Sequence, residues 1–568
     1  MSYNFTNKEV ADLLHNISAV YQIKDFNQFQ IRAYDTAADT IEHLNSELKD
    51  IWETGELDSI PGLGEKLRAY IDELFRTGKV KHFEEVSEKV PDNLFHFLVI
   101  PGVGPKTAMK LAETGIKDFH DLEKRIKEGK LEGAGLSEKI LANIARGIEE
   151  YKRRSDRILL PVAAEIAKDV IDHLFKHPSV KRADTLGSLR RRLSTVGDID
   201  ISAASDKPFE VIEHFKKTPG ISHVVEAGDR TSTIALRNGI RVDLMVQPPE
   251  LYGNLLQHFT GGKNHNIRVR SLALKKGYSV SDNGTKELKS GKLHKFTDEE
   301  AVYKLLEMEC PPPELREDQG EVEAALAHKL PNLVELEDIK GDLHTHSLWS
   351  DGRASIEEMA KEAKRLGREY IVMSDHSYPN LLDFKKRLKE IEHVNDSVEG
   401  FRVISGLEVN INADMTLQVP DEILQMHEVI LVSIHTAFRQ PKEEMTKRII
   451  RALENPNVDI LSHPTGRMLL EREGIEADWE VIFQKVKDLG KTLEINAFPN
   501  RLDLPDNLVR KAKEYGVRFS IDTDSHHINH LSLMEYGVSV ARRGWCVKDD
   551  IVNTLPLAEL KSILKDVK

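Results

Sequence analysis

The chain has 568 residues, of which 40% are hydrophobic and 31% charged. Because a single core stops growing near roughly 250–300 residues, this length predicts several domains. The net charge of −14 excludes a protein coated in basic charge, although local basic patches remain possible. With only Cys310 and Cys546, a disulfide framework and a thiolate zinc site are excluded. No apolar run approaches the roughly 18 residues of a membrane helix. The start MSYNFTNKEV lacks the features of a secretory signal, so we expect a cytoplasmic protein.

The first 155 residues show mainly helical apolar spacing, interrupted by glycine-rich turns. Two turns share one pattern, IPGLGEK at 60–66 and IPGVGPK at 100–106. Glycines let a backbone come close to a phosphate, and the amides that begin the next helix point toward it. One copy is most often an ordinary helix–helix turn, but two copies with a lysine after the second glycine favour a clamp on the DNA backbone. The residues assigned to this contact are Gly62, Gly64, Lys66, Gly102, Gly104 and Lys106, and 131–136 is a weaker third candidate.

Between residues 156 and 310 helices give way to short strands, among them VGDIDISAA and IRVDLMV. Residues two apart on a strand face the same side, so Asp198 and Asp200 can share metal ions, and Asp243 would add a third carboxylate. Three carboxylates on two Mg²⁺ or Mn²⁺ ions are what in-line nucleotidyl transfer requires. An isolated Asp-x-Asp is often only a solvated strand edge. Here the turn Gly187-Ser188, backed by Arg191, offers amides, a hydroxyl and a cation to phosphates, so the set is interpreted as catalytic.

Residues 311–337 begin with three prolines and are acidic, which predicts a linker with one short helix. From residue 338 onward, apolar runs of strand length alternate with amphipathic helices, and seven of these runs end in polar residues. Strands that alternate with helices predict a parallel sheet. Polar residues at the carboxyl end of every strand predict a barrel with its active site at that end, and we expect about seven strands.

Histidines and carboxylates gather at the ends of these predicted strands. A lone histidine at a strand end is most often structural, but nine ligand-type side chains at six strand ends favour a metal centre. Imidazole with carboxylate suits Mn²⁺, Zn²⁺ or Fe²⁺, and the number of ligands supports two or three ions. Such a site hydrolyses phosphoesters by turning bound water into hydroxide. The nine residues are His344, His346, Asp351, His376, Glu408, His435, His463, Asp524 and His526.

The carboxylate and Gly-Ser motifs resemble the palm of family X DNA polymerases, the DNA polymerase beta group. The segment LLQHFTG at 255–261 resembles that family's sugar-discriminating turn. The family often has Tyr where His258 stands, so we expect altered sugar discrimination. The resemblance assigns nucleotide contacts to Gly187, Ser188, Arg191, His258, Phe259, Gly261, Lys263 and Asn266, with Arg270 facing the nascent pair or the template as a DNA contact.

The N-terminal 80 residues, including Ala33-Tyr34, resemble the small lyase-type domain of the same family. By that resemblance the Schiff-base lysine should lie eight residues after the first turn glycine, where this sequence has Tyr70. A Schiff base needs an amine, so we expect 5′-deoxyribose phosphate lyase activity to be weak or absent. Lys66 and Lys79 are interpreted as phosphate contacts.

Residues 338–568 resemble the PHP (polymerase and histidinol phosphatase) family in all its motifs. No ligand of the motif set is missing, so the resemblance implies an active site rather than a vestigial one. Arg467 and Arg439 are candidate phosphate contacts, and Asp375 is a candidate for orienting a neighbouring histidine.

The order of parts resembles the bacterial family X DNA polymerases over nearly the full chain. The expected fold is multidomain, with N-terminal all-α helix-hairpin-helix domains, an α+β nucleotidyltransferase palm and thumb, and a C-terminal distorted (β/α)7 barrel. The expected domains are a lyase-like domain at 1–80, a second hairpin domain at 81–154, the palm at 155–245, the thumb at 246–315, a linker at 316–337 and the barrel at 338–568.

This resemblance implies gap filling in base excision repair, on gapped or nicked double-stranded DNA with deoxynucleoside triphosphates. It implies 3′-end processing by the barrel as 3′→5′ exonuclease, phosphatase or phosphodiesterase, with cleavage at abasic sites as a further option. We expect a monomer associated with the nucleoid. One alternative is a plain phosphoesterase whose N-terminal half only binds DNA, although the three intact aspartates argue against it. Others are a non-catalytic repair scaffold and a small-molecule phosphatase, which leaves the hairpins unexplained.

Overall fold

The computed structural model describes residues 3, 5–42, 48–55, 57–60, 62–88, 90–91, 93–98, 100, 102–116, 119–128, 131, 135–155, 157–377 and 383–560. The chain divides into two compact units, each described by itself. The first comprises Met1–Asp156 and the short segment Ile434–Phe438, and the second comprises Arg157–Ser433 and Arg439–Lys568. Across the described residues, every helix is too short or too polar to traverse a lipid bilayer.

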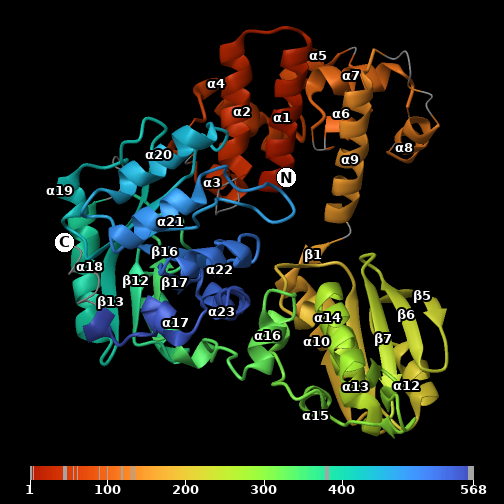
Figure 1. Cartoon of the computed structure of the whole chain (residues 1–568). Coiled ribbons are helices and arrows are strands. Elements are labelled where there is room, and N and C mark those ends of the chain that lie inside the picture. Colours follow the sequence, from red (N-terminus) through yellow and green to blue (C-terminus); the bar gives the residue numbers. More distant parts are fainter. Residues whose placement is uncertain are drawn as a thin grey trace. The chain divides into compact units, whose positions relative to one another are not determined.

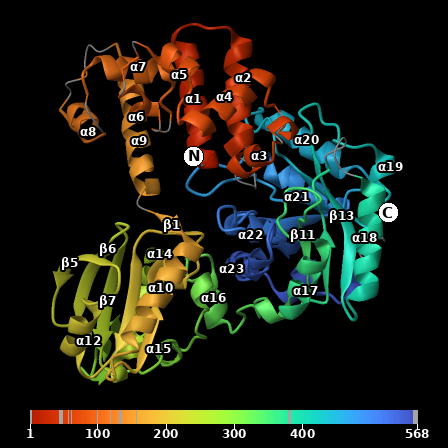
Figure 2. The same cartoon turned by 180° about the vertical axis from the view of Figure 1, so that it is seen from behind.

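The first unit is built from helices around two hydrophobic cores (Figures 1 and 2). One core lies among the helices from α1 to α5 and includes Leu14, Ile71 and Phe75, whereas the other extends from Leu94 to Ile148. The elements are α1 (Asn7–Ile23), α2 (Gln28–Glu42), α3 (Leu48–Thr54), η1 (Leu57–Ser59), α4 (Glu65–Thr77), α5 (Lys81–Ser87), α6 (Leu94–Leu98), α7 (Pro105–Glu113), α8 (Phe119–Lys127) and α9 (Glu138–Ser155).

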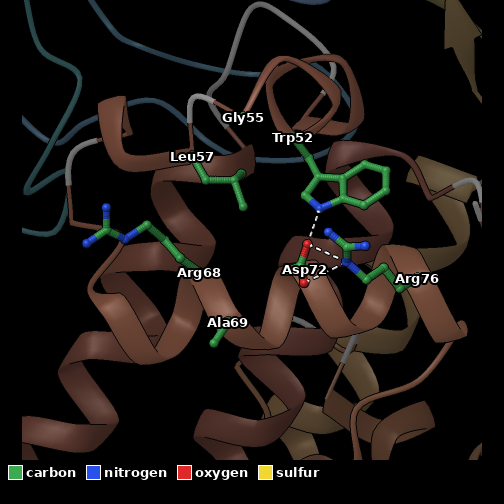
Figure 3. A pocket seen from close by; sticks show the side chains of 7 residues that line it. All are labelled: Trp52, Gly55, Leu57, Arg68, Ala69, Asp72 and Arg76. Carbon is green, nitrogen blue, oxygen red and sulfur yellow. Dashed lines mark hydrogen bonds and ion pairs between the residues drawn. The ribbon is translucent and has the colours of Figure 1, made fainter.

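A surface pocket of about 610 Å³ opens beside α3 and α4 in this unit (Figure 3). The indole of Trp52 donates a hydrogen bond to Asp72 at 2.8 Å, and Arg76 pairs with the same carboxylate at 2.8 Å. Burial opposes ionisation of Asp72, but the hydrogen bonds from Trp52 and Arg76 lower its pKa overall. The network fixes one wall of the pocket, which Arg68 also lines.

The second unit begins with a five-stranded sheet of order β2-β4-β7-β6-β5. Only β4 and β7 pair in parallel, and the other neighbours pair antiparallel. Helices α10 and α12 contribute Ala163, Val170 and Phe215 to the core of this sheet. The elements are β1 (Ile158–Leu159), α10 (Leu160–Leu174), β2 (Arg182–Thr185), α11 (Gly187–Arg190), β3 (Thr195–Val196), β4 (Ile199–Ala204), α12 (Pro208–Phe215), β5 (Ile221–Ala227), β6 (Thr231–Leu236) and β7 (Arg241–Gln247).

Two helices and a small three-stranded sheet, of order β10-β9-β8, follow the palm-type sheet. The segment at 311–337, predicted as a linker, contains η3, α16 and η4, and its Arg316 and Glu321 are fully buried. The elements are η2 (Pro249–Leu251), α13 (Tyr252–Thr260), α14 (Lys263–Lys275), β8 (Tyr278–Ser281), β9 (Gly284–Glu287), β10 (Leu293–His294), α15 (Glu299–Leu305), η3 (Pro313–Leu315), α16 (Glu321–Leu326) and η4 (Leu336–Asp338).

The C-terminal part of the second unit is a seven-stranded parallel sheet in simple chain order, β11 to β17. A parallel bridge between Thr345 and Ser525 links its two ends, so the sheet is nearly closed into a barrel. The strands are β11 (Gly341–Thr345), β12 (Tyr370–Met373), β13 (Arg402–Asn410), β14 (Val429–Ser433), β15 (Ile460–Leu461), β16 (Thr492–Asn496) and β17 (Arg518–Asp522).

Helices alternate with these strands, as the amphipathic pattern predicts. Helix α17 begins at a capping box in which Ser355 and Glu358 satisfy each other's backbone amides. The helices are α17 (Ile356–Arg365), α18 (Phe384–Ser397), α19 (Asp421–Leu424), α20 (Lys442–Leu453), α21 (Trp479–Asp488), α22 (Asp506–Glu514), η5 (Ile528–Leu533), α23 (Met534–Arg543), η6 (Lys548–Asp550) and η7 (Val552–Thr554). The predicted fold class is therefore confirmed in all three of its parts, whereas the predicted domain boundaries stay predictions.

Candidate active sites of the palm and the barrel

The register of β4 and β7 brings two of the three predicted palm carboxylates side by side. Asp200 and Asp243 are direct partners across the parallel pair, and Asp198 lies just before β4 begins. Thr233 of the neighbouring strand β6 donates a hydrogen bond to Asp243. Burial raises the pKa of Asp200 to about 6, with further contributions from the charges of Asp243 and Asp198. A site that disfavours a bare carboxylate in this way favours a cation beside it.

The turn Gly187-Ser188 lies directly against these carboxylates. Gly187 has a φ of +55°, and a Cβ at this position would lie 2.6 Å from the Oδ2 atom of Asp200. Only glycine therefore fits, because the backbone is left-handed and the carboxylate occupies the space of a side chain. Ser188 follows in the short helix α11, and its phosphate contact stays a prediction.

The arginines after this turn are held by acidic side chains that the sequence did not reveal. Arg190 pairs with Glu299 at 2.6 Å, and the buried Arg316 pairs with the other oxygen of Glu299 at 2.7 Å. Burial opposes ionisation of Glu299, but Arg316 and Arg190 lower its pKa to about 2. Arg191, the predicted phosphate contact, donates to Glu317 at 2.8 Å and to the carbonyl of Thr260 at 2.8 Å.

The predicted sugar-discriminating turn is held together by Asn266. Its amide donates to the carbonyls of His258 and Gly261, at 2.9 and 3.0 Å. The guanidinium of Arg270 lies 3.3 Å from the ring of His258, and burial together with this charge lowers the pKa of that histidine. Phe259 meets the His258 ring edge to face at 4.7 Å. Lys263, the first residue of α14, is exposed.

The two predicted hairpins have the same local geometry. Gly62 and Gly102 are left-handed, with φ values of +80° and +82°, and Gly64 and Gly104 are the N-caps of α4 and α7. Lys66 and Lys106 are exposed on the first turns of these helices. Pro61 and Pro101 lie outside the described residues, as do 132–134 of the weaker third candidate.

Aromatic rings occupy the position expected for a lyase lysine. Tyr70 stacks on His82 with ring centroids 5.0 Å apart, and Tyr21 forms a hydrogen bond of 2.8 Å with the same imidazole. Lys79, which the sequence analysis assigns to phosphate, pairs with Glu84 at 3.1 Å.

The barrel brings all nine predicted metal ligands together at the carboxyl ends of its strands. Their ligand atoms form overlapping groups in which all atoms lie within 4.8 Å of one another. These groups are His346, Asp351, His376 and His526; His344, His346 and Asp524; His344, Glu408 and His463; and His376, Glu408 and His435. The palm carboxylates do not converge this closely in the described part of the chain.

The donor atoms of this centre fit bound cations. Among the described residues, the Nε2 atoms of His344, His346 and His526 and the Oδ1 atom of Asp524 are buried and make no hydrogen bond. Buried polar atoms are normally satisfied, so their convergence suits a bound electrophile such as a metal ion. Imidazole and carboxylate together suit Mn²⁺, Zn²⁺ or Fe²⁺.

Comparisons with known proteins match both the polymerase part of the chain and the barrel. A family model described as the DNA polymerase beta thumb matches residues 255–317, and one described as the PHP domain matches 342–497. A helix-hairpin-helix domain matches 5–80, and a SAM-like helix-hairpin-helix tandem matches 96–150. The DNA polymerase/3′-5′ exonuclease PolX of Bacillus subtilis (strain 168) is 34% identical over 98% of this chain and 99% of that protein.

The chain belongs to the PolX family. Within it, the predicted family X polymerase with a PHP domain is confirmed. Two shorter relatives named "probable phosphatase" match part of the chain. That of Thermoanaerobacter sp. (strain X514) is 30% identical over 40% of this chain and 95% of its own length, and that of Acetivibrio thermocellus is 33% identical over 33% and 78%.

Glu494, on β16, lies behind the candidate ligands of the barrel and is not among the residues predicted from the sequence. One of its oxygens lies 2.6 Å from Nδ1 of His344, and the other accepts a hydrogen bond from the backbone amide of His463. A carboxylate that accepts from one ring nitrogen fixes the tautomer and leaves the other nitrogen for a metal. Glu494 stands 150 residues from His344, so no local motif could have revealed the pair.

Asp375 acts on the site less directly than the sequence analysis expected. It accepts hydrogen bonds from Ser347 and Ser350 and pairs with the buried Arg387 at 2.7 Å. Among the described residues, its hydrogen-bond path to a histidine runs through Ser350, whose hydroxyl lies 3.4 Å from Nδ1 of His346. Asp375 therefore holds the loop after β11.

The two predicted phosphate arginines of the barrel lie in different surroundings. Arg467 donates to the loop carbonyls of Arg501 and Leu502, whereas Arg439 is exposed. Arg501 was missed, although its Nε atom lies 3.6 Å from Asp524 and its side chain is 5% exposed. Within the described part of the chain, Arg501 is thus a cation that lies against the proposed ligand set.

We predict a pH-dependent effect of Asp200→Asn on stability in metal-free protein. The folded state raises the pKa of Asp200 to about 6, above about 3.9 in an unfolded chain. The folded state therefore binds the proton of Asp200 more tightly than the unfolded chain does. The resulting stabilisation is complete below about pH 4 and is lost as the pH rises through about 6. The variant should raise the free energy of unfolding at pH 8 by about 1–3 kcal/mol, and the unfolding temperature should rise with it. At pH 4 the variant should have little effect. Calorimetry in buffer that contains a metal chelator measures the unfolding temperature at both pH values.

The matched control for this experiment is Asp229→Asn, in the exposed turn between β5 and β6. An equal shift for Asp200→Asn at both pH values would contradict the assigned electrostatic cause.

We predict that Glu494→Gln lowers the affinity of the barrel for its metal ions by about 10–100-fold, the usual effect of losing a carboxylate behind a ligand histidine. Metal retained against a competing chelator measures the change. Glu428→Gln is the control, because Glu428 supports Ser405 of β13 and belongs to none of the four ligand groups. Equal retention in both variants would exclude the supporting role of Glu494.

Proposed function

We propose that the chain is a DNA polymerase that fills short gaps during base excision repair, and that its barrel is a 3′-5′ exonuclease and 3′-end phosphodiesterase. The observation that supports this most strongly is the likeness to a DNA polymerase/3′-5′ exonuclease along 98% of the chain. The palm carboxylates and the complete barrel set lie within that span. Substrates would be gapped or nicked double-stranded DNA and deoxynucleoside triphosphates, bound by a monomer at the nucleoid.

In the polymerase reaction, Asp198, Asp200 and Asp243 would hold Mg²⁺ or Mn²⁺, which lower the pKa of a primer 3′-hydroxyl and neutralise the triphosphate when bound. Gly187 and Ser188 would hold the triphosphate through backbone amides and a hydroxyl, with Arg191 as the cation. The remaining nucleotide contacts would come from His258, Phe259, Gly261, Lys263 and Asn266, with Arg270 and the hairpin glycines and lysines on DNA.

In the barrel, the nine histidines and carboxylates of the candidate centre would hold two or three Mn²⁺, Zn²⁺ or Fe²⁺ ions, which would supply Lewis-acid activation of water for phosphoester hydrolysis. Glu494 would orient His344, and Asp375 would hold the loop that carries Asp351. The same centre would remove a 3′-phosphate, and cleave at abasic sites as a further activity. The likeness of part of the chain to proteins named as phosphatases supports the phosphatase part.

We predict that single substitutions separate the two activities. Asp198→Ala should abolish synthesis and leave 3′ processing unchanged, whereas His344→Ala should abolish 3′ processing and leave synthesis unchanged, because each removes a ligand of one site only. A one-nucleotide gap labelled at its 5′ and 3′ ends reports both reactions in one assay. No extension by the wild-type protein would refute the polymerase, and unchanged 3′ hydrolysis in His344→Ala would refute the barrel assignment.

We predict weak or no 5′-deoxyribose phosphate lyase activity. Tyr70 cannot form a Schiff base, and its ring is stacked on His82. Borohydride trapping on DNA with a 5′-deoxyribose phosphate end should give little covalent product, and Lys66→Ala should leave that amount unchanged. Efficient trapping in the wild type that is lost in Lys66→Ala would overturn the prediction and identify Lys66 as the amine.

A further inference from the structure

Arg191 is held on two sides by hydrogen bonds within the protein. Its Nε atom donates to Glu317 at 2.8 Å, and Nη1 donates to the carbonyl of Thr260 at 2.8 Å. Only 11% of the side chain is exposed. The hydrogen bonds found for Arg191 among the described residues use Nε and Nη1, so Nη2 is the nitrogen left for a phosphate oxygen.

Glu317 is itself held by the barrel. Arg543, the last residue of α23, approaches the same carboxylate oxygen of Glu317 at 3.2 Å and donates to the backbone carbonyl of Arg191 at 2.9 Å. The Nη2 atom of Arg543 pairs with Asp506 of α22 at 2.7 Å. The side chain of Arg543 is 9% exposed, so these contacts lie largely away from solvent.

The four side chains therefore form a row of alternating charge, Arg191, Glu317, Arg543 and Asp506. Interactions between charges strengthen as water is excluded, so each member stabilises the position of the next. A guanidinium is planar and binds through a rigid fork, and one already fixed in place loses less conformational entropy when a phosphate binds.

We propose that Arg543, a barrel residue, is a positioning residue of the polymerase site, where it acts through Glu317 to orient Arg191 toward the triphosphate. The proposal rests on the function proposed for Arg191. It makes the affinity of the palm for nucleotides depend on helix α23 of the barrel, which extends the role of the barrel beyond hydrolysis.

A neighbouring ion pair separates this role from simple attachment of the barrel. Arg542 of the same helix pairs with Glu314 at 2.9 Å, with side chains 15% and 13% exposed. This pair has comparable burial and joins α23 to the segment that carries Glu317, but neither member contacts Arg191. Arg542→Ala is therefore the matched control for Arg543→Ala.

The experiment measures synthesis on a one-nucleotide gap at varied nucleotide concentration, with the full chain. Arg543→Ala and Glu317→Ala should each raise the KM for the nucleotide by about tenfold and change kcat by less than about twofold, because Arg191 remains but is no longer held. Arg543→Lys should recover part of the loss, since it keeps the charge without the planar fork. Arg542→Ala should match the wild type in KM. Hydrolysis by the barrel, measured on the same samples, confirms that each variant is folded.

The double variant Glu317→Ala/Arg543→Ala should have the KM of the single variants, because the two residues act in series. Additive increases, an unchanged KM in Arg543→Ala, a lower KM, or an equal increase in Arg542→Ala would each overturn the proposal. If the wild-type protein makes no product, the proposed function fails, and calorimetric titration with Mg²⁺ and a deoxynucleoside triphosphate then tests the positioning role directly. Equal binding by the wild type and Arg543→Ala in that titration would refute it.

Discussion

Buried carboxylates lie at the candidate sites of the second unit, and the need to balance their charge determines which groups lie beside them. An ionised carboxylate in a low-dielectric site is strongly unfavourable unless cations approach it. In the thumb, Arg190 and Arg316 supply that charge to Glu299. In the palm no cation of this kind pairs with Asp200 within the described residues, and burial raises its pKa. The structural carboxylate is thus satisfied within the protein, whereas the proposed catalytic one is left for a ligand.

The barrel shows the same division between supporting and reactive atoms. Glu494 contacts Nδ1 of His344 at 2.6 Å, which commits that nitrogen to the protein. Nε2 of His344 is buried without a hydrogen bond among the described residues and faces the other proposed ligands. Parallel pairing places all strand ends at one edge, so residues far apart in the chain converge there. The geometry of the centre is therefore set by the sheet and refined by carboxylates behind the ligands.

The palm and the barrel are joined by polar contacts as well as by the chain. Glu535 of α23 pairs with Arg192 at 3.0 Å, immediately after the arginine proposed to bind phosphate. Tyr536 packs against the core of the palm sheet. A polymerase needs a clean 3′-hydroxyl, and a phosphoesterase in the same chain is present at high effective concentration. These contacts give a physical route by which one site influences the other.

The sequence alone determined the class of fold, and it predicted the hairpin glycines, the three palm aspartates and the nine proposed barrel ligands. Those signals are local: a period of two or 3.6 residues, a glycine turn, or a polar residue at the end of an apolar run. The tertiary structure alone decided which side chains stand behind them. Glu494 is 150 residues from His344, and the contact of Arg543 with the backbone of Arg191 spans 352 residues. Such pairs leave no spacing in the sequence, because the chain brings them together only when the barrel closes and packs on the palm.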